Sequence, residues 1–391
     1  MKILYYSSHP NLSLNASSGP GTHMREMINA FRELGHEVLP IIMGGREDLK
    51  VKSQKSKIKS STQLLKKFIP GILWRTAKEI KLLNFDKQAE KILEKKIKKF
   101  NPHLVYERGA YMQLSGVNVV SALKIKHIIE INAPYLEEVY QFEQSATLLK
   151  RKAIAIEKQQ IQKSNKVVVV SSPLNEYYSQ YTDDINKIVV VPNGIDAKKM
   201  QVDSILKENI LKKYDLLNKT VIGFVGSIFP YHGVDLLIKA VAALYKEHQN
   251  IALMIVGDGM IIPELKKLSE ELNILGITHF TGSIPHKEVP CYIDAMDITV
   301  LPQTNYFCSP VKIFEYGVLG KAIICADTPA VRDVMENNKD GLLIGSTIND
   351  LTAALKKLLS DPATRKIMGE CFKTKVHEKY TWHTHAQTIL S

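Results

Sequence analysis

Short apolar runs alternate along the whole chain with longer segments in which apolar residues recur at helical spacing. The first apolar run lies at 2–7, and a helix is expected at 22–34, with one apolar face formed by Met24, Met27, Ile28 and Phe31. A second run at 37–43 completes a strand–helix–strand start, which is typical of an open parallel sheet. Long helices are expected at 74–100 and 135–163. Further strands are expected at 103–106, 126–131, 166–170, 188–191, 220–225, 251–256, 297–301, 321–326 and 342–344, and one that ends at Phe280. The pattern predicts an α/β fold.

The alternation is interrupted by the turn Pro192-Asn193-Gly194-Ile195-Asp196 and by a polar stretch that runs to about Lys219. The chain has 391 residues, which is too many for one ordinary hydrophobic core. We therefore expect two doubly wound parallel-sheet domains, at 1–195 and 196–375, and a crossover segment at 376–391 that packs on the first domain. Ligands of such sheets bind at the carboxyl ends of the strands, so both domains are expected to offer loops to one cleft.

Positive charge is concentrated between Lys50 and Phe100, a segment that contains 16 Lys and Arg residues but only 4 Asp and Glu residues. The excess equals the net charge of +12 of the whole chain, so the remainder is close to neutral. No zinc finger, helix-turn-helix or aromatic RNA-binding motif accompanies the segment, so nucleic-acid binding is disfavoured. Docking on an anionic membrane surface and a solvated lysine-rich helical face are the alternatives that remain. The apolar residues that could insert at such an interface are Phe68, Ile69, Ile72, Leu73 and Trp74.

The composition, with 45% hydrophobic and 24% charged residues, is that of a globular protein. No apolar run reaches the length of a transmembrane helix, and the run at 2–7 is interpreted as a strand rather than a signal peptide. The four cysteines are scattered and have no metal-ligand spacing. We expect a cytoplasmic protein without a metal site, with peripheral association at the inner face of the membrane as an alternative to a freely diffusing one.

The stretch from Phe307 to Gly317 carries the clearest chemistry of the chain. It follows an expected strand, Ser309 suits a helix N-cap, and Pro310 suits the first helical position. A helix that starts at the carboxyl end of a strand is an anion site, and Lys312 in the first turn is explained if an anion lies beside it. Glu315, one turn further on, could then bind a hydroxyl group. We interpret the pair as a binding site in which a diphosphate lies at the helix tip and a ribose lies against Glu315. The alternative is an ordinary capped helix with a surface Lys–Glu pair.

Three further glycine turns are expected at strand ends: Ser18-Gly19-Pro20-Gly21, Gly226-Ser227 with His232-Gly233, and Gly282-Ser283-Ile284-Pro285. Small residues at such places allow a phosphate or a flat base to approach the backbone closely. The dinucleotide motif G-x-G-x-x-G and the P-loop motif are both absent. The turns therefore favour a phosphate-bearing ligand without indicating a dinucleotide fold or a P-loop NTPase.

The stretches 192–196, 226–240, 255–259 and 309–321 together resemble those of a family-4 retaining glycosyltransferase with the GT-B fold. The resemblance implies two Rossmann-like domains and transfer of a sugar from a nucleotide diphosphate, of the UDP or GDP type, to a hydroxyl group. It also implies retention of the anomeric configuration, hexosyltransferase-type specificity and no required metal or other cofactor. The donor-binding residues that it implies are Gly19, Gly21, Ser227, His232, Gly282, Ser283, Ile284, Ser309, Pro310, Val311, Lys312 and Glu315.

The sequence departs from the family pattern in the donor site. The family often carries two glutamates seven residues apart; Glu315 matches the second, whereas the first falls on Phe307, which cannot accept a hydrogen bond. Ser227 and His232 stand where many members have Arg and Lys. Lys312 is therefore expected to replace the missing charges at the leaving diphosphate, with its ammonium directed toward His232 and the loop of Gly19.

In the first domain, Asn132 stands where the family commonly has a histidine, and Glu130 lies two residues before it. Together with Lys312 and Glu315 these are the candidate catalytic residues. Glu130 could act as the carboxylate of a double displacement, although a strand-end glutamate is more often a salt-bridge partner. The resemblance favours a front-face mechanism, in which the leaving phosphate takes the acceptor proton. The candidate acceptor-binding residues, alternatively surface residues on loops, are His23, Glu107 and Arg108.

The resemblance implies an acceptor hydroxyl on a glycan or a lipid-linked molecule, as in the synthesis of a cell-surface polysaccharide or a glycolipid. Two other functions fit the same fold. A nucleotide-sugar epimerase or hydrolase would need no acceptor, and a non-catalytic partner subunit would bind the nucleotide sugar without turnover. The phenylalanine at 307 and the two missing cations favour the last of these alternatives.

Overall fold

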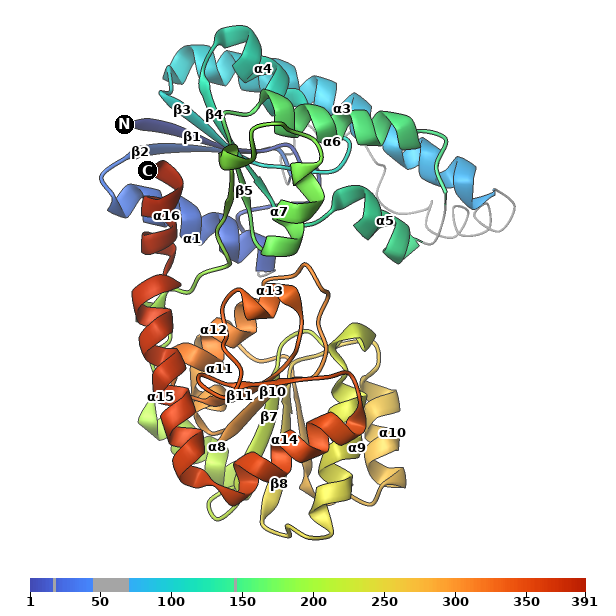
Figure 1. Cartoon of the computed structure of the whole chain (residues 1–391), viewed down its shortest axis with the longest axis vertical. Helices are drawn as coiled ribbons and strands as arrows, with labels where there is room; N and C mark the ends of the chain where they lie inside the picture. Colours follow the sequence, from blue (N-terminus) through green and yellow to red (C-terminus); the bar gives the residue numbers. More distant parts are fainter. Residues whose placement is uncertain (17–18, 45–69, 144–145) are drawn as a thin grey trace. The chain divides into compact units, whose positions relative to one another are not determined.

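The computed structural model describes residues 1–16, 19–44, 70–143 and 146–391 (Figure 1). The chain divides into a first unit, residues 1–191 with 386–391, and a second unit, residues 192–385. The division lies four residues before the expected boundary at 195. The crossover segment is shorter than expected, because helix α15, Pro362–Lys379, belongs wholly to the second unit. The last helix, α16 (Trp382–Leu390), reaches the first unit, where Lys166 Nζ donates to the Ile389 carbonyl over 3.0 Å.

The first unit is built on a six-stranded parallel sheet of order β2-β1-β3-β4-β5-β6 (Figure 1). Its strands are β1 Lys2–Ser7, β2 Glu37–Ile42, β3 Leu104–Arg108, β4 Lys126–Ile131, β5 Lys166–Val169 and β6 Ile188–Val190. Its helices are α1 Gly19–Glu33, α3 Gly71–Phe100, α4 Ser115–Leu123, α5 Tyr135–Glu143, α6 Lys150–Lys163 and α7 Ser172–Ser179. Helix α1 covers one face, where Phe31 meets the Tyr106 ring at 5.2 Å between centroids. Helices α3 and α4 cover the other face, where Leu93 packs with Val105 and Val120.

The second unit repeats this architecture with a six-stranded parallel sheet of order β12-β11-β10-β7-β8-β9. Its strands are β7 Thr220–Val225, β8 Ile251–Val256, β9 Thr278–Gly282, β10 Ile298–Leu301, β11 Ala322–Ala326 and β12 Leu342–Ile344. Its helices, besides α15, are α8 Ser204–Lys213, α9 Val234–Tyr245, α10 Ile262–Glu271, α11 Val289–Asp294, α12 Val311–Val318, α13 Pro329–Arg332 and α14 Ile348–Ser360. One continuous apolar core joins the sheet to these helices. The predicted doubly wound parallel architecture of both halves is confirmed.

Two helical predictions were wrong in detail. The single helix expected at 135–163 is two helices, α5 and α6. The polar stretch after the boundary contains helix α8, which the Asp203 carboxylate caps by accepting from the N–H groups of Ile205 (2.9 Å) and Leu206 (3.1 Å). Asp followed by a helix-forming segment is a recognisable N-cap signal, so this helix could have been predicted from the sequence.

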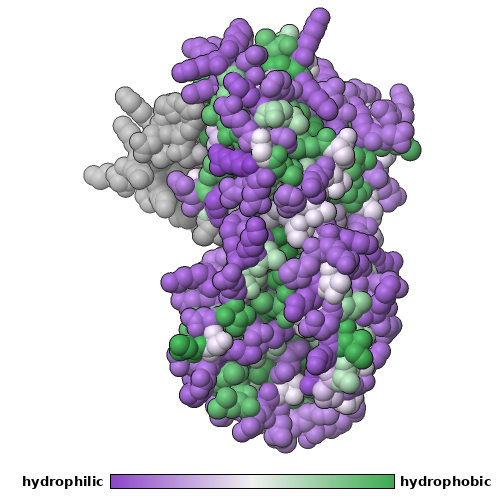
Figure 2. All heavy atoms as spheres, turned by 90° about the vertical axis from the view of Figure 1, so that its left-hand side faces the viewer, coloured by the Kyte–Doolittle hydropathy of each residue, from purple (hydrophilic) through white to green (hydrophobic). Residues whose placement is uncertain are grey.

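Most of the visible surface of the chain is polar, and apolar side chains form only small patches on it (Figure 2). Within the described ranges, the structure has no helix that combines the length and the apolar character needed to cross a bilayer. The basic part of α3 at 70–100 lies among the described residues, whereas the predictions made for 50–69, including Phe68 and Ile69, lie outside them.

Helix α3 also supplies a cap to a neighbouring helix. The Asp86 side chain is buried, and its Oδ2 accepts from the N–H groups of Leu114 (2.7 Å) and Ser115 (3.0 Å), at the start of α4. Its other oxygen, Oδ1, is buried and has no hydrogen-bond partner among the residues that the structure describes. Burial raises the pKa of Asp86 from 3.8 to about 6. The ionised carboxylate is therefore less favourable in the folded chain than in the unfolded one, so folding stability falls as the pH rises from about 4 to about 6.

We expect Asp86→Asn to stabilise the protein at pH 8 by about 1–2 kcal/mol and to have little effect at pH 4, because it keeps an acceptor for α4 and removes the buried charge. Denaturant unfolding at the two pH values measures this difference. Asp86→Ala is the control: it removes the acceptor as well and should destabilise at both pH values. A gain for Asp86→Asn that is equal at pH 4 and pH 8 would contradict the assignment.

Candidate active site

Helix α12 begins at Val311, with Pro310 as its N-cap residue and no side chain bonded to its first turn. The prediction that Ser309 is the N-cap was wrong. Ser309 Oγ instead accepts from the N–H of Asn193 (3.0 Å), and the Ser309 carbonyl accepts from Asn193 Nδ2 (2.6 Å). The dense turn at 192–196 thus holds the segment that leads into α12. The N–H groups at the helix tip therefore lack a side-chain cap, as an anion site requires.

A tyrosine fixes α12 against the carboxyl end of the central strand β7. Tyr316 is fully buried, and its hydroxyl accepts from the N–H of Val225 (2.9 Å), the last residue of that strand. On the far side, Gly317 allows close packing of α15, since a Cβ there would lie 2.5 Å from the Phe372 ring. These two contacts place the first turn of α12 beside the Gly226-Ser227 turn.

Lys312 is directed toward that turn. Its Nζ lies 3.3 Å from His232 Nε2 and 4.4 Å from the centre of the Phe224 ring. Gly226 leaves room for it, because a Cβ there would come within 3.1 Å of the same Nζ. Burial lowers the pKa of Lys312 to about 8. The predicted contact of Lys312 with His232 is confirmed, and among the described residues Lys312 forms no ion pair with Glu315. Gly19 belongs to the other unit, so the expected approach of Lys312 to its loop stays a prediction.

His232 ends the short 3₁₀ turn Pro230–His232 after β7. Its Nδ1 lies 2.8 Å from the Ser227 carbonyl, which can only accept, so Nδ1 carries the proton and Nε2 is the lone-pair nitrogen that faces Lys312. Burial, and next the charge of Lys312, lower the pKa of His232 to about 4. His232 is therefore neutral near pH 7 in the unliganded protein, and Lys312 is the cation of this turn.

Glu315 lies one helical turn further along α12 and is half-buried. Among the residues that the structure describes, no donor is within hydrogen-bonding distance of its carboxylate, and burial raises its pKa, an effect that the charges of His286 and Lys312 partly oppose. A half-buried carboxylate without a donor is costly in free energy unless a ligand supplies one. His286, at the start of the 3₁₀ turn His286–Glu288 after β9, is near enough for its charge to act on Glu315, and no sequence pattern indicated this.

Three glycines with positive φ close the carboxyl ends of β7, β8 and β9: Gly226 (136°), Gly257 (126°) and Gly282 (70°). The N–H of Gly257 donates to the Gly282 carbonyl over 3.1 Å, and a Cβ at Gly257 would lie 2.0 Å from the Gly226 carbonyl oxygen. The space beside Gly282 is open, since no atom lies within 4 Å of a Cβ built there. Its neighbours differ: Ser283 is exposed, whereas Ile284 packs on the core. The backbone of these three turns thus forms a surface at the carboxyl edge of the sheet, next to Lys312 and Glu315.

Phe307 is 3% exposed, and its ring meets Tyr306 edge-on at 5.2 Å. The residue at the position of the family's first glutamate is therefore a buried aromatic side chain. The Phe307 side chain therefore cannot replace the contact that a glutamate at this position would make with a hydroxyl group of the donor sugar.

In the first unit, a buried carboxylate organises the ends of β3 and β4. Glu130 is 1% exposed, and both of its oxygens are engaged: Oε2 by His23 Nε2 (2.9 Å) and the Tyr106 hydroxyl (2.5 Å), Oε1 by Arg108 Nη1 (2.6 Å) and Asn132 Nδ2 (2.6 Å). The His23 and Arg108 side chains hold the pKa of Glu130 well below its usual range despite its burial. Both oxygens of Glu130 are already hydrogen-bonded, which disfavours it as a catalytic nucleophile, and this role stays a prediction. Its carboxylate is the shared acceptor that positions the side chains of His23, Arg108 and Asn132.

Glu107 does not join this cluster. Neighbouring residues of a strand point to opposite faces of the sheet, and Glu107 lies on the face opposite to Arg108, under α4. Its Oε2 accepts from His127 Nε2 over 3.0 Å, it is 1% exposed, and a Cβ at Gly116 would overlap it. The prediction that Glu107 and Arg108 together hold the acceptor was therefore wrong for Glu107. Arg108 and His23 remain candidates through their place in the Glu130 cluster.

Gly19 and Gly21 lie in the first turn of α1. Gly21 is required by packing, since a Cβ there would lie 2.5 Å from the Ala16 carbonyl oxygen, whereas nothing lies within 4 Å of a Cβ at Gly19. Arg25 holds the preceding loop by donating to the carbonyls of Leu14 (2.5 Å) and Ala16 (2.7 Å). Across the described part of the chain, no group of three His, Cys, Asp or Glu side chains is placed to hold a metal ion.

Two family models match the chain: "Glycosyltransferase Family 4" over residues 17–199 and "Glycosyl transferases group 1" over residues 207–374. The GDP-mannose-dependent alpha-(1-6)-phosphatidylinositol monomannoside mannosyltransferase of Mycobacterium tuberculosis is 23% identical over 230 residues, 57% of this chain and 60% of that one. The chain thus matches about 60% of the length of this relative. An uncharacterized glycosyltransferase of Haemophilus influenzae is 27% identical over 361 residues, 89% of each chain.

Solved structures agree in fold. HepE of Anabaena, crystallised with UDP and glucose, has a TM-score of 0.73 at 15% identity and covers 100% of this chain and 98% of its own. A glycosyltransferase of Rickettsia africae has a TM-score of 0.72 at 17% identity, with 100% and 96% coverage. The two family models together span nearly the whole chain, one on each unit. The chain belongs to the family-4 glycosyltransferases of the GT-B fold.

Proposed function

We propose that the protein is a retaining, metal-independent glycosyltransferase of the hexosyltransferase type, which moves a sugar from a UDP- or GDP-linked donor to a hydroxyl group. The observation that carries the proposal is the uncapped tip of α12, with Lys312 against His232 and with a half-buried Glu315 that lacks a hydrogen-bond donor. It is supported by the UDP and glucose in the HepE crystals and by the GDP-mannose dependence of the mycobacterial relative.

The donor would bind along the carboxyl edge of the second unit. Its diphosphate would accept from the N–H groups at the tip of α12 and from Lys312, and the same anion would favour protonation of His232. Its ribose hydroxyls would donate to Glu315, and its base would lie on the backbone beside Gly282. Because Lys312 stands where negative charge develops on the leaving diphosphate, it would stabilise the transition state more than the ground state.

The front-face mechanism is the one we propose. Double displacement needs a carboxylate free to attack the anomeric carbon, and the candidate carboxylate of the first unit, Glu130, is held by four partners. In the proposed mechanism a leaving phosphate oxygen takes the proton of the acceptor hydroxyl as that hydroxyl forms the new glycosidic bond on the same face of the sugar.

We propose a glycan or a lipid-linked molecule as the acceptor, bound by the first unit near His23, Arg108 and Asn132, in the synthesis of a cell-surface polysaccharide or a glycolipid. The basic helix α3 belongs to the same unit, and an acceptor at an anionic membrane would suit it. We therefore propose that the protein works in the cytoplasm, with peripheral association at the inner face of the membrane.

A thermal-shift screen of UDP, GDP and their sugars is the first test, since a ligand that binds only the folded chain raises its melting temperature. We expect a shift of several degrees for one nucleotide diphosphate and its sugars and none for the nucleoside. With that donor and a glycan or lipid-linked acceptor, proton NMR of the product should show the donor's anomeric configuration. Interconversion or release of the sugar without an acceptor would instead identify an epimerase or a hydrolase. Binding of the nucleotide sugar without any turnover would identify a non-catalytic partner subunit.

A further inference from the structure

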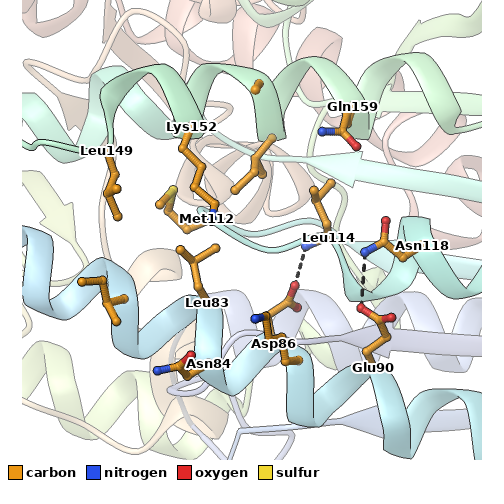
Figure 3. Close-up of a pocket in the computed structure, with 14 residues that line it drawn as sticks. Leu83, Asn84, Asp86, Glu90, Met112, Leu114, Asn118, Leu149, Lys152 and Gln159 are labelled. Carbon is orange, nitrogen blue, oxygen red and sulfur yellow. Dashed lines mark hydrogen bonds between the residues drawn. The ribbon is translucent and has the colours of Figure 1, made fainter.

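A groove of about 440 Å³ lies between α3 and α6 of the first unit, and none of its lining residues belongs to the Glu130 cluster (Figure 3). The residues before α4 form part of its wall, and Lys152 extends from α6 toward Met112 (Figure 3). Its apolar lining residues are Ile80, Leu83, Met112, Leu114, Leu149, Ala155 and Ile156. The groove therefore offers a mainly hydrocarbon surface to a ligand.

The two acidic side chains of the lining are bonded to other groups of the protein. Asp86 points to the N–H groups of Leu114 and Ser115, and Glu90 accepts from Asn118 Nδ2 over 3.3 Å (Figure 3). A sugar or a nucleotide needs several converging donors and acceptors or an aromatic platform in its pocket, and the lining contains no aromatic residue. An aliphatic chain fits this surface better than either.

Exposed apolar side chains surround the groove on the same two elements. Leu73 and Ile80 are seven residues apart, on the same face of α3, and are 49% and 47% exposed. Leu148, just before α6, is 63% exposed. The N–H of Leu148 donates to Thr76 Oγ1 over 3.2 Å, which joins the Leu148 segment to α3 beside Leu73 and Ile80. These are three of the five large apolar residues that are exposed in the described part of the first unit. An apolar patch that continues into a groove indicates an interaction surface rather than chance exposure.

Cations flank this surface. Lys87 and Lys152 line the groove, and neither forms an ion pair with any residue that the structure describes. Further exposed lysines of the same helices are Lys81, Lys91 and Lys150. Unpaired lysines beside apolar side chains complement a ligand that has a negative head and a hydrocarbon tail.

We propose that the groove binds one hydrocarbon chain of an anionic membrane lipid, with the lipid phosphate among the lysines of α3 and α6. The site adds a defined ligand and location to the membrane association proposed above and rests on that part of the proposed function. It is independent of the donor site, so its failure would leave the assignment of Lys312 and Glu315 untouched. The exposed Leu73, Ile80 and Leu148 would lie at the lipid surface around the bound molecule.

The test uses the full chain and lysophosphatidylglycerol below its critical micelle concentration, titrated by calorimetry. We expect saturable binding, at least tenfold tighter than that of lysophosphatidylcholine. The charge-removing variant Lys87→Gln/Lys152→Gln should lose about tenfold in affinity. The control Lys95→Gln/Lys96→Gln, two exposed lysines of α3 outside the groove lining, should bind like the wild type.

The groove itself is tested by Ala155→Trp, which fills it from an exposed position on α6. We expect this variant to lose lipid binding while its thermal shift with the nucleotide diphosphate stays that of the wild type. Unchanged lipid binding by Ala155→Trp would overturn the groove, and equal binding of the two lysolipids would overturn the anionic head. If Ala155→Trp does not fold, the lysine variant and its control decide the question.

Discussion

Lys312→Met is expected to lower kcat/KM for the sugar donor by two to three orders of magnitude, with little change in folding stability. A well-placed group that stabilises charge on a leaving oxyanion contributes about 3–4 kcal/mol to transition-state binding. His232 is neutral without a ligand, because burial and the charge of Lys312 lower its pKa to about 4, so Lys312 supplies the permanent charge of this turn. Steady-state kinetics with saturating acceptor measure the loss. Activity within threefold of the wild type would remove Lys312 from the donor site.

Lys312→Arg is the matched control for charge, and it also tests the pH dependence. Burial lowers the pKa of Lys312 to about 8, so the unliganded lysine loses its proton as the pH rises through 8. The affinity of the wild type for the nucleotide diphosphate should therefore be constant between pH 6 and 7.5. Above pH 8 it should decrease, with a slope that approaches about a tenfold loss of affinity per pH unit. Arginine keeps its charge throughout this range, so the affinity of the arginine variant should stay level. A fall of equal steepness in both proteins would place the titrating group elsewhere.

Glu315→Gln is expected to weaken binding of the ribonucleoside diphosphate by about 10- to 100-fold, since a hydrogen bond to a charged group contributes about 1.5–3 kcal/mol. The variant is nearly isosteric, and the glutamate that it replaces has no hydrogen bond to lose in the described part of the structure. The sharper readout is discrimination at the ribose. The wild type should bind the 2′- and 3′-deoxy forms of the nucleotide more weakly than the ribose form, and Glu315→Gln should bind all three nearly alike.

Competition calorimetry with the three nucleotides gives this comparison directly. Loss of overall affinity with unchanged discrimination would show that another group holds the ribose. Asn193→Ala is a useful companion, because Asn193 fixes the segment before α12 through Ser309 without lying on the helix itself. It should weaken all three nucleotides equally.

The sheets and much of the donor site could be predicted from the sequence because both depend on local patterns. Buried parallel strands are continuous apolar runs, and the contact between Lys312 and His232 follows from two strand-end turns on one sheet edge. The role of Ser309 could not be predicted in this way. A serine before a proline suits an N-cap, but Asn193, 116 residues away, takes its hydroxyl.

The Glu130 cluster shows the same limit. Its partners come from positions 23, 106, 108 and 132, on α1, on β3 and after β4, so no single stretch of sequence contains it. Glu107 is a different case, because strand alternation already places it on the face opposite to Arg108. That period-two pattern was present in the sequence and would have excluded Glu107 from the acceptor site.

We propose above all that the tip of α12 binds the diphosphate of a sugar donor through Lys312. The most direct measurement is the ratio of affinities for the nucleoside diphosphate and the corresponding monophosphate, by calorimetry at pH 7, in the wild type and in Lys312→Met. We expect the wild type to bind the diphosphate at least tenfold more tightly than the monophosphate and this preference largely to disappear in the variant. A preference of the same size in both proteins would contradict the proposal.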